Sequence, residues 1–187
     1  MPNRIVEEQL RARGLELAGP CERLSSRGEL LEISALLRDF TPAEADLLGA
    51  NMLLVRAQPG QLLIAEGEAS DWMMLLLRGT VDVGKRRVGV AAADQEEPGG
   101  TARLAVIKEG AVVGEMSMLD GEPRYASCWA LSEVEAAVLS RAAVARIIAA
   151  HPAVGAKLLV KLTQLLAQRL RNTSNQLVKA LQRPQAS

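Results

Sequence analysis

The sequence predicts an α+β fold in which a jelly-roll-like β-roll lies between helical segments at both ends of the chain. From Met52 to Leu139, short apolar runs alternate with glycine, proline and aspartate, which is typical of short strands joined by turns. On either side of this stretch the apolar residues recur at helical spacing. We therefore divide the chain into a helical section over 1–49, a β-roll over 50–139 and closing helices over 140–187.

The section over 1–49 is predicted to be helical, in three stretches. Helix-forming residues of mixed charge occupy 4–18 and end at Gly19-Pro20, and a second helical stretch covers 29–38. In Thr41-Pro42-Ala43-Glu44, a threonine precedes a glutamate by three residues and proline takes the first helical position. This capping-box pattern predicts a short helix that ends near Gly49.

The β-roll section is divided by turn residues. They stand at Pro59-Gly60, Gly67, Gly79, Gly110 and Asp120-Gly121. Short strands at this spacing indicate a roll or barrel. Residues 85–103 are small and polar with two charge clusters, so we predict a long hairpin loop there and assign it no function.

The closing section begins with a helical pattern over 140–150, and His151-Pro152 then leads into a helix over about 153–182. Thirty residues extend about 45 Å, which is more than a small domain needs to cover its core. An apolar stripe follows this helix, made of Leu159, Leu162, Leu166, Leu170, Thr173, Leu177 and Leu181. The stripe packs either on its own β-roll or on the same helix of a second copy, and we favour the homodimer because the far end would project beyond the roll.

The most specific chemical signature lies over 114–127. Gly114 allows a close approach of the backbone to a ligand, and 115–119 can form a helical turn whose unpaired N–H groups face an anion. Pro123 stiffens the return of the chain, so that the planar guanidinium of Arg124 can reach the same anion. A carboxylate would repel a phosphate, so Glu115 is predicted to accept from sugar hydroxyls and to pair with Arg124.

These residues carry a family resemblance. Gly114-Glu115 followed by Pro123-Arg124-x-Ala126-Ser127 resembles the phosphate-binding cassette of cyclic nucleotide-binding domains. Further matching features, in order along the chain, are Pro59-Gly60, Glu66-Gly67, the run 72–77 before Arg78-Gly79, and His151-Pro152. The resemblance covers roughly 47–181 and implies the cyclic nucleotide-binding β-roll.

The resemblance also implies a ligand and its contacts. The expected ligand is a cyclic mononucleotide, cyclic AMP first and cyclic GMP second, and no cofactor or metal is expected. Arg124 and the amides of Glu115, Met116 and Ser117 would bind the cyclic phosphate, assisted by Ser127 and the Ala126 backbone. Glu115 would accept the ribose 2′-hydroxyl.

Part of the long helix resembles a segment of bacterial catabolite activator proteins. Arg169-Leu170-Arg171-Asn172-Thr173-Ser174 is similar to the segment in which a Thr-Ser pair reads adenine, the serine coming from the partner subunit. This chain holds about one helical turn more than that family between Pro152 and Arg169. Thr173 and Ser174 therefore either read the base or are ordinary helix-surface residues.

The cassette departs from the family at two positions. Ser117 stands where a small apolar residue is usual, and it is expected to be harmless or to add a donor. Tyr125 follows Arg124 where a smaller residue is common. Its ring would fill part of the base pocket, cap a larger ligand or point outward, which leaves the base open.

Composition excludes several classes of function. The 22 basic and 22 acidic residues cancel, which argues against a duplex-binding surface. No apolar run spans a bilayer and no signal pattern follows Met1, so a cytoplasmic protein is expected. Cys21 and Cys128 are far apart and expected to be free thiols. The single histidine, together with the absence of a phosphate-binding GKS/T loop or a serine elbow, argues against an enzyme.

The sequence thus predicts a sensor that transmits binding of a cyclic mononucleotide through its long helix. The chain ends at Ser187, where catabolite activator relatives continue into a helix-turn-helix, so no DNA contact is expected and the output is predicted to be a protein partner. The N-terminal helices are a candidate surface for it. Two alternatives stay open: a scaffold domain that keeps the fold without binding nucleotide, and a cyclic dinucleotide binder, which would need a wider pocket and more arginines.

Overall fold

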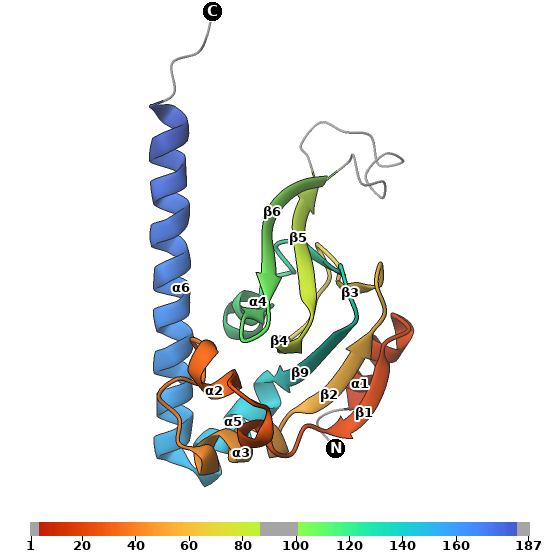
Figure 1. The fold of residues 1–187 in the computed structure, drawn as a ribbon, viewed down its shortest axis with the longest axis vertical. Helices are drawn as coiled ribbons and strands as arrows, with labels where there is room; N and C mark the ends of the chain where they lie inside the picture. The colour runs from red at the N-terminus through yellow and green to blue at the C-terminus, as the bar shows by residue number, and fades with distance from the viewer. Residues whose placement is uncertain (1–3, 87–100, 183–187) are drawn as a thin grey trace, which may run out of the picture.

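The computed structural model describes residues 4–86 and 101–182. Two antiparallel sheets form the roll, several of the short helices gather at one end of it, and one long helix runs along its side (Figure 1). The predicted α+β class and the roll are confirmed. The predicted loop over 85–103 falls largely outside the described residues, but its flanks are strands that pair as far as Arg86 and Thr101.

The strands form two sheets. The order is β1-β2-β9-β4-β7 in the five-stranded sheet and β3-β8-β5-β6 in the four-stranded sheet, and every pair is antiparallel. Their bounds are β1 Glu16–Pro20, β2 Leu53–Ala57, β3 Leu62–Ile64, β4 Trp72–Arg78, β5 Thr80–Arg86, β6 Thr101–Lys108, β7 Val112–Val113, β8 Ser127–Ala130 and β9 Val134–Ser140.

The apolar run at 72–77 forms most of strand β4 and packs into the core on both faces of the sheet. Successive side chains of a strand point to opposite faces of the sheet. Met73, Leu75 and Leu77 enter the cluster beneath the helices, whereas Trp72, Met74 and Leu76 enter the cluster between the two sheets. Both faces of β4 are therefore covered, and the strand reads as a continuous apolar run rather than an alternating one.

The N-terminal section is only partly helical, so the prediction of helix over 4–18 was wrong in its second half. Helix α1 spans Arg4–Ala12 and ends where Gly14 adopts a φ of +73°. Such a φ suits glycine and reverses the chain, so the next residues can reach an existing sheet. Residues 16–20 accordingly pair with β2 as strand β1.

The predicted helix over 29–38 is also shorter than expected. A 3₁₀ turn, η1, spans Leu24–Ser26, and α2 covers only Leu30–Ile33. The chain becomes extended at Ser34, whose hydroxyl donates to the Gly110 carbonyl at 2.8 Å. This buried hydrogen bond competes with continued helix, because a serine side chain that binds distant backbone favours a break.

The predicted capping box is confirmed. Helix α3 spans Pro42–Ala50, the Thr41 hydroxyl accepts from the Glu44 N–H at 3.3 Å, and the Glu44 carboxylate accepts from the Thr41 N–H at 2.8 Å. Glu44 also accepts from Lys157 at 2.7 Å, which ties α3 to the long helix. Helix α5 spans Arg141–Ala150, and the long helix α6 spans Pro152–Leu181, close to the bounds that the sequence predicts.

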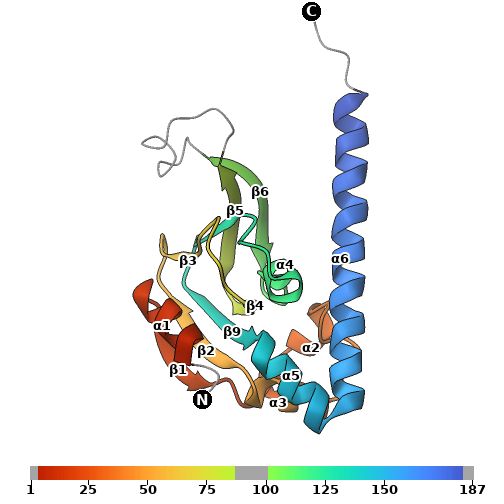
Figure 2. The same ribbon diagram turned by 180° about the vertical axis from the view of Figure 1, so that it is seen from behind.

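Two adjacent stripes follow α6, where the sequence analysis expected one. The stripe against the protein's own core contains Val154, Leu158, Leu162 and Leu165. Leu159, Leu170, Leu177 and Leu181 are exposed, about 100° further around the helix. The predicted stripe thus mixes the two, since its Leu162 packs inward. The C-terminal half of α6 rises past the short helices along the side of the roll (Figures 1 and 2). None of the helices in the described residues combines the length and apolar character that crossing a membrane requires.

Candidate functional site

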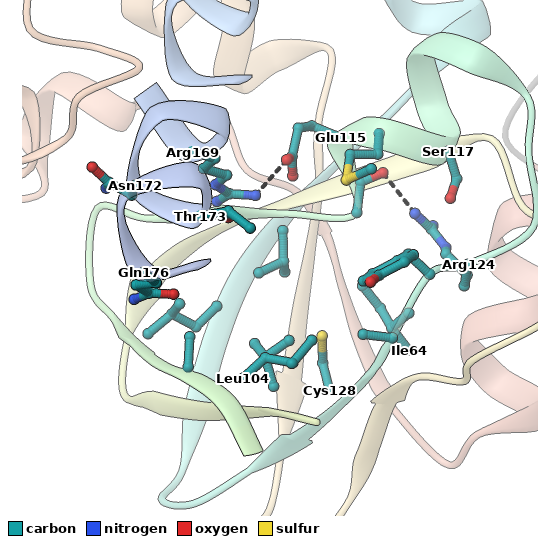
Figure 3. Close-up of a pocket in the computed structure, with 18 residues that line it drawn as sticks. Ile64, Leu104, Glu115, Ser117, Arg124, Cys128, Arg169, Asn172, Thr173 and Gln176 are labelled. Carbon is teal, nitrogen blue, oxygen red and sulfur yellow. Dashed lines mark hydrogen bonds and ion pairs between the residues drawn. The ribbon is translucent and has the colours of Figure 1, made fainter. Parts of the chain in front are cut away.

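A cavity of about 400 Å³ opens between the roll, the cassette helix and the C-terminal half of α6 (Figure 3). Its floor is apolar, and polar side chains stand at its two ends. Arg124 and Ser117 lie at one end, and the side chains of α6 form the opposite wall (Figure 3). The lining residues are Ile64, Val83, Leu104, Ala105, Ile107, Val113, Gly114, Glu115, Met116, Ser117, Arg124, Tyr125, Ala126, Cys128, Arg169, Asn172, Thr173 and Gln176.

The cassette forms the predicted helical turn, α4, over Glu115–Asp120. Gly114 precedes it with a φ of +77°, and a Cβ on this residue would lie 2.5 Å from the Arg124 guanidinium. Glycine is therefore required here both by the backbone conformation and by the close approach. The amides of the first three helical residues have no acceptor within the helix, and those residues all line the cavity.

Arg124 is buried without a carboxylate partner. Its side chain is 3% exposed, it donates to the carbonyls of Gly114 at 2.6 Å and Trp72 at 2.5 Å, and its guanidinium lies 4.3 Å from the Trp72 ring centre. Its Nε is buried without a hydrogen-bond partner. Burial, and then the positive charge of Arg13, lower the Arg124 pKa to about 10, so it stays charged at neutral pH. This cation has the charge and the free donor that an anion would use.

Glu115 pairs with Arg169 of α6, where the sequence analysis predicted Arg124. The Glu115 carboxylate is 1% exposed; its Oε1 accepts from Arg169, which also donates to the Val112 carbonyl (Figure 3). The Glu115 Oε2 is buried and has no partner. The pair joins the cassette to the long helix and leaves one carboxylate oxygen free to accept a further hydrogen bond.

The chain also matches known proteins. The family model described as "Cyclic nucleotide-binding domain" covers residues 54–151, which is just over half of the chain. The chain belongs to the cyclic nucleotide-binding domain family. The match ends at His151, so the wall formed by α6 lies beyond it.

Several relatives extend this result. A CRP-like cAMP-activated global transcriptional regulator of Mycobacterium tuberculosis is 30% identical over 149 residues, which are 80% of this chain and 61% of the regulator. A cyclic nucleotide-binding domain from Methylobacillus flagellatus is 31% identical, with a TM-score of 0.77 over 91% of each chain. The Thermus thermophilus catabolite activator protein is 26% identical, with a TM-score of 0.67 over 79% of this chain and 63% of that one. This chain therefore spans about three fifths of the regulators it matches.

The structure brings most of the predicted site residues of this family member to the cavity. Those that line it are Gly114, Glu115, Met116, Ser117, Arg124, Tyr125, Ala126 and Thr173. Ser127 does not line it, and its hydroxyl accepts from the Glu66 N–H at 2.9 Å. Ser174 is exposed on α6 beside Thr173 and does not line the cavity either. A contact from Ser127 to the phosphate stays a prediction.

Tyr125 stands at the edge of the cavity and is 56% exposed. The Lys85 ammonium lies 3.9 Å from its ring centre and donates to its carbonyl at 2.7 Å. This cation–π contact holds the ring while leaving much of it in solvent. A ring in this position can cap a ligand at the edge of the cavity, which is one of the three alternatives that the sequence left open.

Sequence reasoning missed the polar wall on α6. Arg169, Asn172 and Gln176 line the cavity with Thr173. Positions 169, 172, 173 and 176 are spaced as i, i+3, i+4 and i+7, which places them on one helix face. In the sequence these polar positions continue the helical spacing of the buried residues Val154, Leu158, Leu162 and Leu165. The prediction was instead based on the leucines of the neighbouring stripe.

The cassette helix is also held from behind by a residue that the sequence analysis did not identify. Arg141, the first residue of α5, donates to the carbonyls of Met118 at 2.6 Å and Ser117 at 3.0 Å. These carbonyls lie in the last turns of α4, where the Ser117 carbonyl also accepts from the Gly121 N–H at 3.0 Å. Arg141 therefore joins the cassette to the helices that close the domain.

Proposed function

We propose that this protein is a sensor that binds a cyclic mononucleotide, with cyclic AMP as the preferred ligand. The observation that carries the proposal is Arg124, a buried cation with a free Nε and no carboxylate partner among the described residues, next to three unpaired helix amides. A cyclic phosphate supplies the missing negative charge and the acceptors for both. The apolar floor of the cavity suits a base and a sugar ring.

The free Oε2 of Glu115 gives the ribose a partner. A 2′-hydroxyl can donate to this buried carboxylate oxygen, whose other oxygen already accepts from Arg169. The base then extends toward α6, where Thr173, Asn172 and Gln176 offer donors and acceptors. We propose that Thr173 distinguishes adenine from guanine.

The same contacts allow occupancy to be transmitted. The ligand would touch the cassette and α6 together, and the Glu115–Arg169 pair already joins them. A ligand that interacts differently with two positions of α6 shifts the balance between them. We propose that the response passes through α6 to a protein partner, for which the N-terminal helices are one candidate surface.

Isothermal titration of the folded protein with cyclic AMP and cyclic GMP tests the ligand. We expect a Kd of about 1 μM or tighter for cyclic AMP and weaker binding of cyclic GMP. Heat from neither ligand, with a circular dichroism spectrum of a folded protein, would overturn the sensor and favour the scaffold domain. Tighter binding of a cyclic dinucleotide than of either mononucleotide would favour the other alternative.

We further propose that the exposed stripe of α6 pairs with the same stripe of a second copy. Leu170, Leu177 and Leu181 are 68%, 59% and 76% exposed, and water contact by so many leucines on one helix face is unfavourable. Sedimentation equilibrium is expected to give a dimer for the wild type and a monomer for Leu170→Glu and Leu177→Glu. Gln164→Glu changes an exposed residue on a different face of the helix; it is the charge-matched control and is expected to stay dimeric. A monomeric wild type would contradict this prediction.

A further inference from the structure

Arg13 is a buried arginine that lies outside the cassette. It follows helix α1, its side chain is 9% exposed, and it pairs with the carboxylate of Glu68, which is 34% exposed. Its Nη1 is buried and has no hydrogen-bond partner. A guanidinium with an unpaired buried N–H is a costly arrangement for a residue that serves only to hold a helix in place.

The Trp72 ring connects Arg13 to the anion site. Trp72 is fully buried, its Nε1 donates to the Gln9 side chain of α1 at 2.8 Å, and the Arg13 guanidinium lies 5.6 Å from its ring centre. The Arg124 guanidinium lies 4.3 Å from the same ring centre. The two guanidinium groups are therefore at most about 10 Å apart, within the range over which partly buried charges interact strongly.

Charges of both signs lie around this ring, and the carboxylates among them are Glu68, Asp71 and Glu115. Glu68 pairs with Arg13, but it is the more exposed partner, so water screens its charge more than that of the arginine. Glu115, the buried carboxylate of the cavity, already pairs with Arg169. The positive charge of Arg13 accordingly contributes to the lowered pKa of Arg124. Glu115 and Asp71 raise the Arg124 pKa, but after burial the largest single effect on it is that of the Arg13 charge.

We propose that Arg13 is a second cation of the anion site, which strengthens phosphate binding through space without touching the ligand. The proposal rests on the proposed function, since it requires an anionic ligand at Arg124. Repulsion between two buried arginines is relieved when an anion binds beside one of them, so part of the binding energy comes from Arg13. Helix α1 lies on the side of the roll away from α6, so the N-terminal segment would set the affinity from behind the site (Figures 1 and 2).

Two substitutions with opposite expected effects test this role. Arg13→Gln removes the cation and should weaken cyclic AMP binding about three- to tenfold, whereas Glu68→Gln removes its counter-charge and should tighten binding about two- to fivefold. Arg13→Lys keeps the charge and should bind like the wild type. Arg11→Gln, which removes an exposed arginine of α1, is the matched control and should leave the Kd unchanged. Isothermal titration measures each Kd, and thermal unfolding confirms that each variant is folded.

A purely structural role predicts a different pattern. Arg13→Gln and Glu68→Gln both break the same ion pair, so if the pair only holds α1 in place, both should change the Kd in the same direction. That result, or an unchanged Kd for Arg13→Gln, would overturn the proposal while leaving the sensor in place. Absence of cyclic AMP binding by the wild type would overturn the proposed function and this inference with it.

Discussion

Replacing Arg124 with methionine is expected to weaken cyclic AMP binding by tens to thousands of fold, a loss of about 2 to 5 kcal/mol. Arg124 is 3% exposed and has no carboxylate partner among the described residues, so a phosphate is its natural counter-charge. Methionine fills a similar volume against Trp72 but supplies neither charge nor donors. The substitution should therefore reduce the affinity for the ligand more than it reduces the stability of the fold.

The comparison needs a charge-matched control and a second substitution. Arg171→Met removes an exposed arginine of α6 and should leave the Kd unchanged. Arg124→Lys keeps the charge but loses the planar fork that reaches two carbonyls at once, so its affinity should lie between those of wild type and Arg124→Met. Isothermal titration with thermal unfolding of each variant measures both effects. A folded Arg124→Met that binds within about threefold of wild type would show that Arg124 does not hold the phosphate.

The parts of this molecule that the sequence predicted well are those set by local chemistry. The capping box at Thr41 and Glu44 satisfies its own backbone, and the glycine before α4 is required by a single backbone conformation. The long helix likewise follows from a run dominated by alanine, leucine, lysine, glutamine and arginine, with one proline at its start. Each of these features depends on residues within a few positions of one another, so a pattern in the sequence is sufficient.

The wrong predictions concern features that depend on contacts between residues far apart in the sequence. Residues 16–20 contain helix formers, yet they form β1 because the edge of β2 is available for pairing. The stripe on α6 was predicted from six leucines and Thr173, although the face turned to the protein continues into polar residues at 169–176. The partner of Glu115 was predicted to be Arg124, nine positions away, but Arg169 of α6 is its partner in the structure. No spacing in the sequence distinguishes these two arginines as partners.

Glu115→Gln is expected to weaken cyclic AMP binding by about 10- to 100-fold, the second of the two largest effects. Glu115 is 1% exposed and its Oε2 is the free acceptor that we assign to the ribose 2′-hydroxyl. A hydrogen bond to a buried charged acceptor is stronger than one to a neutral amide, and the glutamine keeps the shape while losing the charge. Titration calorimetry of this variant gives the size of the loss but not its origin.

A thermodynamic cycle that changes both the protein and the ligand identifies the interaction that causes this loss of affinity. With 2′-deoxy cyclic AMP the wild type should lose a similar factor, whereas Glu115→Gln should lose little more, because the interacting hydroxyl is already without its charged partner. Independent, additive losses would mean that Glu115 acts through Arg169 rather than on the ribose. Arg169→Met separates the two roles: it removes the link to α6 but leaves the carboxylate, so the variant should still distinguish cyclic AMP from its deoxy analogue. If Arg169→Met no longer distinguishes the two ligands, the Glu115 carboxylate depends on Arg169 for its position. The ribose contact and the transmission to α6 would then depend on the same ion pair.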